Sequence, residues 1–343
     1  MTEIKKILLS RTDAIGDLIL TLPMVDVIKQ NFPAAKVFIL GRNYNKPIAQ
    51  AAILVDGFVD WSELENQTEK NIVEEIKKQN FDVIVNVFPN KKIATVSKKA
   101  GIPIRIGTSR RFFHWINCNY LVNLSRKNSD LHEAQLNIKL LQKLNIPTDF
   151  SLETLKNFGR IKPFAQLPNE INLLLNKNEK PKIILHPKSK GSAKNWCITN
   201  FVKLADMLLE NNFDVFFTGT AEENNLIKTE LSEHFPTVKL PTVIDLMGKL
   251  NLSELITFIS KCDFLVAAST GPLHIGAALG INVIGIYPPI RPMHPARWQP
   301  LGINANFLCV EKECSKCRNS SICYCMQEIT PEHILKIILG KNI

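Results

Sequence analysis

A short polar stretch between two apolar runs combines residue types that hold phosphate. Ser-Thr-Gly-Pro, residues 269–272, follows the run DFLVAA and precedes the small-residue run LHIGAALG. Pro272 suits the first turn of a helix, where free backbone N–H groups and the helix dipole form an anion site. We therefore expect Thr270 and Gly271 at a phosphate-binding helix start, with His274 beside it. The alternative for His274 is a packed or capping residue.

A second stretch, HPKSKGSAKNW at residues 186–196, joins small polar residues to cations after another apolar run. Backbone N–H groups and lysines in such a loop can cradle phosphate, although the Gly-x4-Gly-Lys spacing of a Walker loop is absent. The alternative is a solvated basic loop in which Trp196 only packs. The small polar and basic residues of this loop are Lys188, Ser189, Lys190, Gly191, Ser192 and Lys194.

The stretch RTDAIGDLILTLP, residues 11–23, places carboxylates at the first strand-to-helix turn. Gly16 permits a tight turn, so Asp17 stands at a helix start on the sheet edge where ligands bind. Asp13 is a second acid in the same turn. The alternative for Asp17 is a purely capping role that complements the helix dipole.

A third strand-to-helix turn, TGTAEEN at residues 218–224, carries two neighbouring acids. A carboxylate of Glu222 or Glu223 at this place can hold ribose hydroxyls, as acids do in other doubly wound sites. The alternative is that both glutamates only favour the helix start.

The stretch CVEKECSKCRNSSICYCMQ, residues 309–327, gathers four thiols. Cys314 and Cys317 form a C-x2-C pair, and Cys323 and Cys325 follow after a short loop. Four thiolates can hold a structural Zn²⁺, although the C-x-C spacing of the second pair is atypical. Reduced thiols and a labile disulfide are the alternatives. No acidic cluster suited to Mg²⁺ is apparent in the sequence, so we expect no metal requirement for catalysis.

Short β-branched runs alternate with segments of helical period, which predicts an α/β fold with parallel sheets. The looser, proline-containing stretch 145–180 predicts a linker between two doubly wound units, with a ligand cleft between them. No Gly-x-Gly-x-x-Gly follows the first strand, so a Rossmann-type dehydrogenase or epimerase lacks support. The expected strands are 5–10, 36–40, 81–88, 104–107, 182–187, 213–219, 263–269 and 282–288, and the expected helices are 16–32, 132–144, 200–210, 252–261 and 331–339.

The composition favours anionic partners. The formal net charge is +10 and the sequence pI is near 9.1, which suits phosphate-bearing substrates or acidic lipid as well as a merely soluble basic protein. Aromatic residues are few and no lysine or arginine block is long, so we expect no nucleic-acid partner. No apolar run is long enough for a membrane span and the first residues do not form a signal peptide. We expect a cytoplasmic protein with reduced cysteines.

Several motifs in one order together resemble glycosyltransferase family 9, the ADP-heptose:lipopolysaccharide heptosyltransferases. The resemblance runs from KILLSRTDAIGDLILTLP through HPKSKGSAKNW and TGTAEE to STGPLHIGAALG and YPPIRPMHPARWQPLG. It implies a GT-B fold of two Rossmann-like domains. It implies an acceptor-binding domain at 1–165, a nucleotide-sugar-binding domain at 166–330, and a helix at 331–343 that packs back on the first domain.

The resemblance also implies a role for each motif. Asp17 is the implied general base, with Asp13 and Arg11 as acceptor-side candidates. Many family members carry aspartate where this chain has Ser269, which brings no charge and leaves the identity of the sugar open. The implied donor and phosphate ligands are Lys194, Ser192, Ser269, Thr270, Gly271 and His274, and the implied nucleoside contacts are Glu222 and Leu250.

The implied reaction is an inverting transfer of heptose from ADP-heptose to the inner core of lipopolysaccharide, with no cofactor. A phosphorylated glycolipid of the lipid A–Kdo type is the implied acceptor, reached from the cytoplasmic face of the inner membrane by peripheral contact. Transfer from another nucleotide-sugar and a non-catalytic nucleotide- or glycan-binding role are the alternatives.

Overall fold

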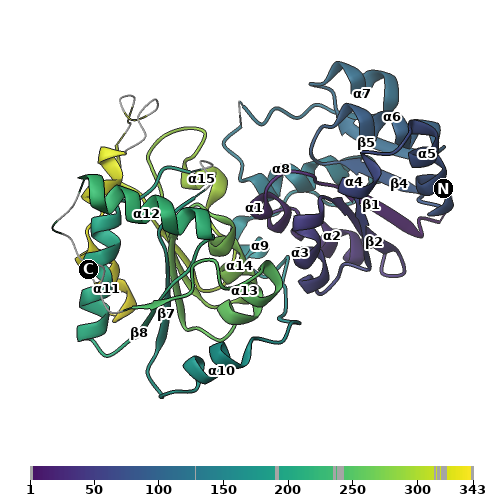
Figure 1. Cartoon of the computed structure of the whole chain (residues 1–343). Helices are drawn as coiled ribbons and strands as arrows, with labels where there is room; N and C mark the ends of the chain where they lie inside the picture. Colours follow the sequence, from purple (N-terminus) through teal and green to yellow (C-terminus); the bar gives the residue numbers. More distant parts are fainter. Residues whose placement is uncertain are drawn as a thin grey trace. The chain divides into compact units, whose positions relative to one another are not determined.

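The computed structural model describes residues 3–127, 129–189, 193–234, 237, 243–312, 314, 317 and 323–340. Its contacts divide the chain into two compact units, Met1–Ile161 and Lys162–Ile343. Each unit is a six-stranded parallel sheet flanked by helices (Figure 1), which confirms the expected α/β class. The division expected between residues 165 and 166 lies close to this boundary.

The first sheet has the strand order β3-β2-β1-β4-β5-β6 and is parallel throughout. Successive strands are added toward one side of the sheet up to β3 and toward the other side from β4 onward. The carboxyl edge at this switch, between β1 and β4, is where doubly wound sheets bind ligands. β3 and β6 were not expected, because their short runs GFVD and YLV carry no apolar alternation. The strands are β1 Lys6–Ser10, β2 Lys36–Gly41, β3 Gly57–Asp60, β4 Val83–Asn86, β5 Ile104–Thr108 and β6 Tyr120–Val122.

The segment expected as one helix over 16–32 forms two helices. Pro23 begins the second of them, because proline has no N–H for an internal helix bond but fits the first turn. The first turn after β1 is therefore separate from the longer helix behind it. The helices of this unit are α1 Ile15–Ile19, α2 Pro23–Asn31, α3 Lys46–Ala51, α4 Trp61–Leu64, α5 Glu69–Lys78, α6 Lys91–Lys99, α7 Phe112–Asn117, α8 Glu133–Lys139 and α9 Leu152–Leu155, with 3₁₀ turns at Asn43–Asn45 and Leu140–Leu144.

The second sheet repeats this arrangement, with the order β12-β11-β10-β7-β8-β9 and only parallel pairs. The switch lies between β7 and β10, so the ends of β10, β7 and β8 are neighbours on one edge. β9 and β12 were not expected. The strands are β7 Lys182–His186, β8 Asp214–Phe217, β9 Ile244–Asp245, β10 Phe264–Ala268, β11 Asn282–Ile286 and β12 Ala305–Leu308.

The last helix, α16 Pro331–Ile338, belongs to the second unit, where it packs on α11 Ile198–Glu210. Its buried Ile334 and Ile338 join that unit's core. The resemblance instead implied packing on the first domain; the apolar face of α16 is covered here by the core around α11. The other helices of this unit are α10 Asn169–Leu175, α12 Ala221–His234, α13 Leu252–Ile259, α14 Gly271–Leu279 and α15 Pro295–Trp298, with a 3₁₀ turn at Tyr324–Glu328.

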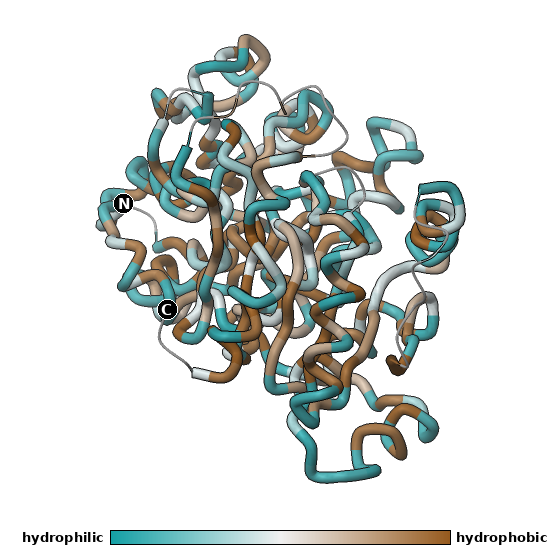
Figure 2. The backbone as a smooth tube through the Cα atoms, turned by 90° about the vertical axis from the view of Figure 1, so that its left-hand side faces the viewer, coloured by the Kyte–Doolittle hydropathy of each residue, from teal (hydrophilic) through white to brown (hydrophobic). Residues whose placement is uncertain are grey.

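The apolar strands lie inside each unit. Figure 2 shows the brown, hydrophobic segments mostly in the interior, while the segments around them carry most of the teal. The central strands β4 and β7 are almost wholly buried, as expected for parallel strands covered on both faces. Among the described residues, no helix has the length and hydropathy needed to cross a bilayer.

Candidate active site

A buried arginine organises the carboxyl edge of the first sheet. Arg11 follows β1 directly, and its guanidinium is shared among three carboxylates. Nε donates to Asp13 Oδ1 at 2.7 Å, Nη1 donates to Glu133 Oε1 at 3.1 Å, and Nη2 donates to Asp17 Oδ1. These hydrogen bonds fix the two acids of the first turn against the start of α8.

A second arginine supports the same cluster from the loop before α8. Arg126 Nε donates to Glu133 Oε1 at 3.0 Å, and its Nη2 donates to Asn137 Oδ1 at 2.8 Å. Asn137 in turn donates to Leu20 O at 3.0 Å, at the end of α1. With every carboxylate ionised, the two arginines and the three acids carry a net charge of −1, since two positive charges face three negative ones. One carboxylate charge of the cluster is therefore not compensated by an arginine, and it can accept a proton.

Burial perturbs the titration of this cluster. It raises the pKa of Asp13 to about 6, against the opposing pull of Arg11, and the nearby Asp17 charge adds to the rise. Burial alone would lower the pKa of Arg11, but the carboxylates around it outweigh that effect and raise it. The Asp13 and Asp17 side chains remain 22% and 20% exposed, so both acids can be reached from solvent.

Glu133 and Asn137 were missed in the sequence, although α8 was expected. They lie four residues apart, so they share one helix face, and both are buried. A glutamate and an asparagine on the apolar face of an amphipathic helix require buried polar partners. That pattern was the available signal, and Arg11 is the partner that the fold supplies.

The second sheet brings three of the expected loops to one edge. β10, β7 and β8 are neighbours in register, and they end at Ala268, His186 and Phe217 respectively. Thr270 is the first residue before α14, and its side chain does not cap the helix. Its Oγ1 is buried without a hydrogen-bond partner among the described residues, and Thr270 is only 6% exposed. A buried hydroxyl without a partner at a helix start is suited to an incoming anion.

The neighbours of Thr270 have different surroundings. Ser269 shares a side-chain hydrogen bond with the hydroxyl of the fully buried Tyr287. Tyr287 also donates to Trp298 O at 2.6 Å. His274 is buried in the first turns of α14, as the packing alternative expected, while it also stands near the helix start.

The loop after β7 divides its residues between packing and exposure. Lys188 is paired with Glu230 of α12, so its charge is already compensated within the unit. Trp196 is buried and donates to Ile329 O at 2.9 Å, which agrees with its packing alternative. Lys194 is partly exposed. The expected phosphate ligand Ser192 lies outside the described residues.

The start of α12 separates the two glutamates. Glu223 is buried and closes a capping box with Thr220, whose N–H donates to Glu223 Oε2 at 2.8 Å. Glu222 is exposed beside it. The loop that leads to Leu250 passes close by, because Gly248 N donates to Gly219 O at 2.8 Å. The two expected nucleoside contacts therefore lie on adjoining segments.

The C-terminal cysteines converge. The Sγ atoms of Cys314, Cys317 and Cys325 all lie within 4.8 Å of one another, and the Cys323 thiol shares a hydrogen bond with that of Cys317. Cys317 N donates to Cys314 Sγ at 3.4 Å. Hydrogen bonding from the Cys314 thiol lowers the pKa of Cys317 to about 7. All eight cysteines of the chain carry free thiols.

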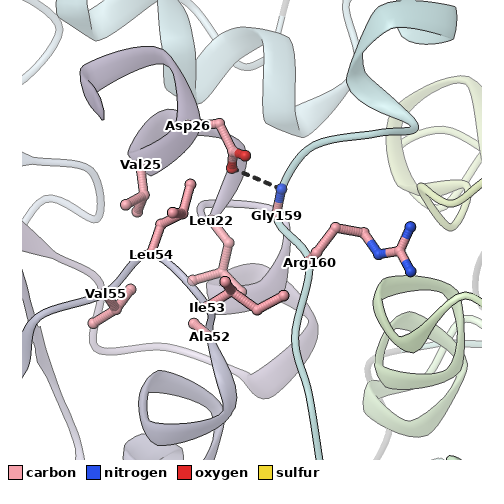
Figure 3. A pocket seen from close by; sticks show the side chains of 9 residues that line it. All are labelled: Leu22, Val25, Asp26, Ala52, Ile53, Leu54, Val55, Gly159 and Arg160. Atoms are coloured by element: carbon pink, nitrogen blue, oxygen red, sulfur yellow. Dashed lines mark hydrogen bonds between the residues drawn. The ribbon is translucent and has the colours of Figure 1, made fainter. Parts of the chain in front are cut away.

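A small cavity of about 200 Å³ lies in the first unit beside α2 (Figure 3). It is lined mainly by apolar side chains, including Leu22 and Ile53. Asp26 points toward Gly159, whose N–H donates to Asp26 Oδ2 at 2.8 Å. Burial raises the pKa of Asp26 to about 6. None of the residues expected to bind substrate lines this cavity.

The chain is similar to known glycosyltransferases. The model of glycosyltransferase family 9 (heptosyltransferase) matches residues 70–324. A Haemophilus influenzae protein named only as a glycosyltransferase is 29% identical over 307 residues, which are 87% of this chain and 86% of that protein. Lipooligosaccharide heptosyltransferase 2 of the same bacterium is 24% identical over 292 residues, 82% of each chain.

Solved structures share the fold. The glycosyl transferase family 9 protein from Veillonella parvula DSM 2008 has a TM-score of 0.79 at 19% identity, covering 99% of this chain and 98% of its own. The E. coli heptosyltransferase WaaC, solved with ADP, has a TM-score of 0.71 at 14% identity, covering 98% of this chain and all of its own at 100%.

Proposed function

The chain belongs to glycosyltransferase family 9, and from this membership we propose that it transfers heptose from ADP-heptose to the inner core of lipopolysaccharide. Its two Rossmann-like units have the GT-B architecture, and it is a glycosyltransferase of the heptosyltransferase type. The observation that best supports the proposal is the buried, unpartnered Thr270 hydroxyl at the start of α14. The diphosphate of a nucleotide-sugar needs hydrogen-bond donors, and this hydroxyl can supply one.

The second unit binds the donor in this proposal. The backbone N–H groups at the start of α14, the Thr270 hydroxyl and Lys194 hold the diphosphate, with His274 beside them. Ser192 is a further phosphate ligand by resemblance. Glu222 and the Leu250 segment contact the nucleoside. An ADP-sugar is supported by the related E. coli heptosyltransferase solved with ADP.

The first unit supplies the base. Asp17 accepts the proton of an acceptor hydroxyl, whose oxygen forms a bond to the anomeric carbon of the donor sugar. The bond from that carbon to the diphosphate oxygen breaks, and the anomeric configuration inverts. The departing diphosphate gains negative charge, which Lys194 and the N–H groups of α14 stabilise. Arg11 holds the base in place, while Asp13 faces the acceptor side.

The acceptor in this proposal is a phosphorylated glycolipid of the lipid A–Kdo type, met at the cytoplasmic face of the inner membrane. The test incubates the whole chain with ADP-heptose and this acceptor and follows the acceptor by mass spectrometry. We expect a product heavier by one heptose. Binding of ADP-heptose without a product, across acceptors of the inner core, would favour a non-catalytic relative instead.

Ser269 favours a second candidate within the same reaction. The Ser269 hydroxyl shares a hydrogen bond with the buried Tyr287 hydroxyl. Serine brings no negative charge to the donor sugar. A donor sugar other than heptose is therefore the alternative. Parallel incubations with ADP-glucose, UDP-sugars and GDP-sugars decide between the two, because the true donor gives the largest kcat/KM.

We also propose that Cys314, Cys317, Cys323 and Cys325 hold a structural zinc ion. Protein purified without chelator should contain about one zinc per chain, since four thiolates complete a tetrahedral structural site. Cys317→Ser should lose the metal and lower the Tm, because the segment behind the cluster packs against Trp196. Cys262→Ser, a change of a buried thiol outside the cluster, is the matched control. Zinc-free protein with an unchanged Tm would contradict this proposal.

A further inference from the structure

The positive charge of the chain is concentrated in one segment. Residues 91–129 contain nine Lys and Arg residues and no Asp or Glu. The whole chain has 42 Lys and Arg against 32 Asp and Glu, so the remainder has 33 against 32 and is almost neutral. The net charge of +10 therefore comes almost entirely from this stretch of the first unit.

The same segment exposes large apolar side chains. Phe112, Trp115 and Ile116 of α7 are 80%, 63% and 54% exposed. His114 and Asn117 on the other side of α7 are buried, so the helix is anchored by its polar face. Its outer face is apolar, the reverse of an ordinary surface helix.

Cations surround this apolar face. α6 lies next to α7 (Figure 1), and Lys98 Nζ of α6 donates to Ile116 O at 2.9 Å. Arg110 and Arg111, which precede α7, are exposed and form no ion pair among the described residues. We call Lys98, Arg110, Arg111, Phe112, Trp115 and Ile116 the α6–α7 surface.

We propose that the α6–α7 surface docks on a lipid bilayer that contains anionic lipid. Transfer of the Phe112 and Ile116 side chains from water into an apolar phase lowers their free energy. Trp115 suits the interface between lipid chains and headgroups. Lysine and arginine beside them attract anionic headgroups. A nucleic acid offers phosphates but no apolar layer for Phe112 and Ile116. The docking rests on the proposed function for its purpose, since it brings the base-bearing unit to a lipid-anchored acceptor.

Vesicle co-sedimentation of the full chain tests the docking. We expect binding to phosphatidylcholine vesicles that contain phosphatidylglycerol, weak binding to phosphatidylcholine alone, and release by added NaCl. Arg110→Glu with Arg111→Glu should weaken binding by roughly tenfold or more, since each cation near the surface contributes to it. Lys228→Glu with Lys261→Glu makes the same charge change on exposed lysines of the second unit and should leave binding nearly unchanged. Equal losses in the two double variants would overturn the proposal.

The apolar part of the surface has its own control. Phe112→Ala with Ile116→Ala should weaken vesicle binding, whereas Leu173→Ala with Leu226→Ala, on similarly exposed leucines of the second unit, should not. Trp115 is exposed, whereas Trp61 and Trp196 are buried. Brominated lipid should therefore quench the fluorescence of Trp115 in the bound protein. Trp115→Phe should remove most of that quenching. Absence of quenching in the bound protein would overturn insertion.

Two measurements separate this inference from the proposed function. Transfer to a delipidated, water-soluble acceptor should be unchanged in the Arg110→Glu, Arg111→Glu variant, because no residue of the surface belongs to the acid cluster. Vesicle binding needs no substrate, so it stands or fails even if the transferase assay gives no product. Tighter binding to single-stranded DNA than to anionic vesicles would assign the surface to nucleic acid and refute bilayer docking.

Discussion

Asp17→Asn should lower kcat by roughly 10²–10⁴-fold, the usual contribution of a positioned general base. The amide keeps the size of the side chain and an oxygen for Arg11, but it cannot take a proton from the acceptor hydroxyl. The affinity for ADP-heptose should stay nearly unchanged, because the proposed donor ligands lie in the second unit. Steady-state kinetics and calorimetric titration with ADP-heptose measure the two quantities.

Asp26→Asn is the matched control for this substitution. Asp26 is also a partly buried carboxyl of the first unit, but it accepts a hydrogen bond from Gly159 N rather than from Arg11. The asparagine oxygen can keep that hydrogen bond, so kcat should not change. A normal kcat in Asp17→Asn would show that Asp17 is not the base. A comparable loss in Asp26→Asn would show that the loss in Asp17→Asn reflects a general effect on the first unit.

Arg11→Met should lower the free energy of unfolding by about 3–5 kcal/mol, because it removes the buried cation of Asp13 and Asp17 and leaves Glu133 with Arg126 alone. Urea denaturation followed by circular dichroism measures the loss. Burial already raises the folded-state pKa of Asp13 above its unfolded value, and without Arg11 this pKa rises further, so the folded variant binds that proton more tightly. The loss should therefore be largest above pH 7 and shrink as the pH falls below about 6, the pKa of Asp13 with Arg11 present.

Arg42→Met provides the comparison for this result. Arg42 pairs with Glu65 at a half-exposed site, where an ion pair contributes about 0–1 kcal/mol because water screens it. Its loss should be small and nearly independent of pH. If the Arg11 and Arg42 variants unfold alike, the buried network does not stabilise the first turn as described.

The sheets could be predicted because their strands are buried on both faces. Such strands appear in the sequence as β-branched apolar runs, so β1, β4, β7 and β10 were found near their observed positions. Short edge strands such as β3 and β12 carry half-exposed residues and lack that pattern. Pro23 could have indicated a helix start at that residue, but the apolar residues on both sides of it keep a helical period, so one helix over 16–32 was expected.

The partners of the charged residues could not be predicted. The Arg11 and Glu133 pair spans 122 residues, and Lys188 finds Glu230 across 42. Local spacing contains no information about contacts of this range, because the tertiary fold creates them. The loops themselves were predictable, since parallel strands bring their carboxyl ends to one edge whatever the partners are.

The support of Asp17 by α8 separates two properties that enzymes often encode together. In the proposed reaction the motif around Asp17 supplies the group that takes the proton, whereas Glu133 and Asn137, encoded far downstream, hold the Arg11 side chain that fixes this group. Substitutions in α8 can thus change how firmly Asp17 is held while the first motif itself stays identical. Engineering of a more rigid first turn in this protein would begin with that helix.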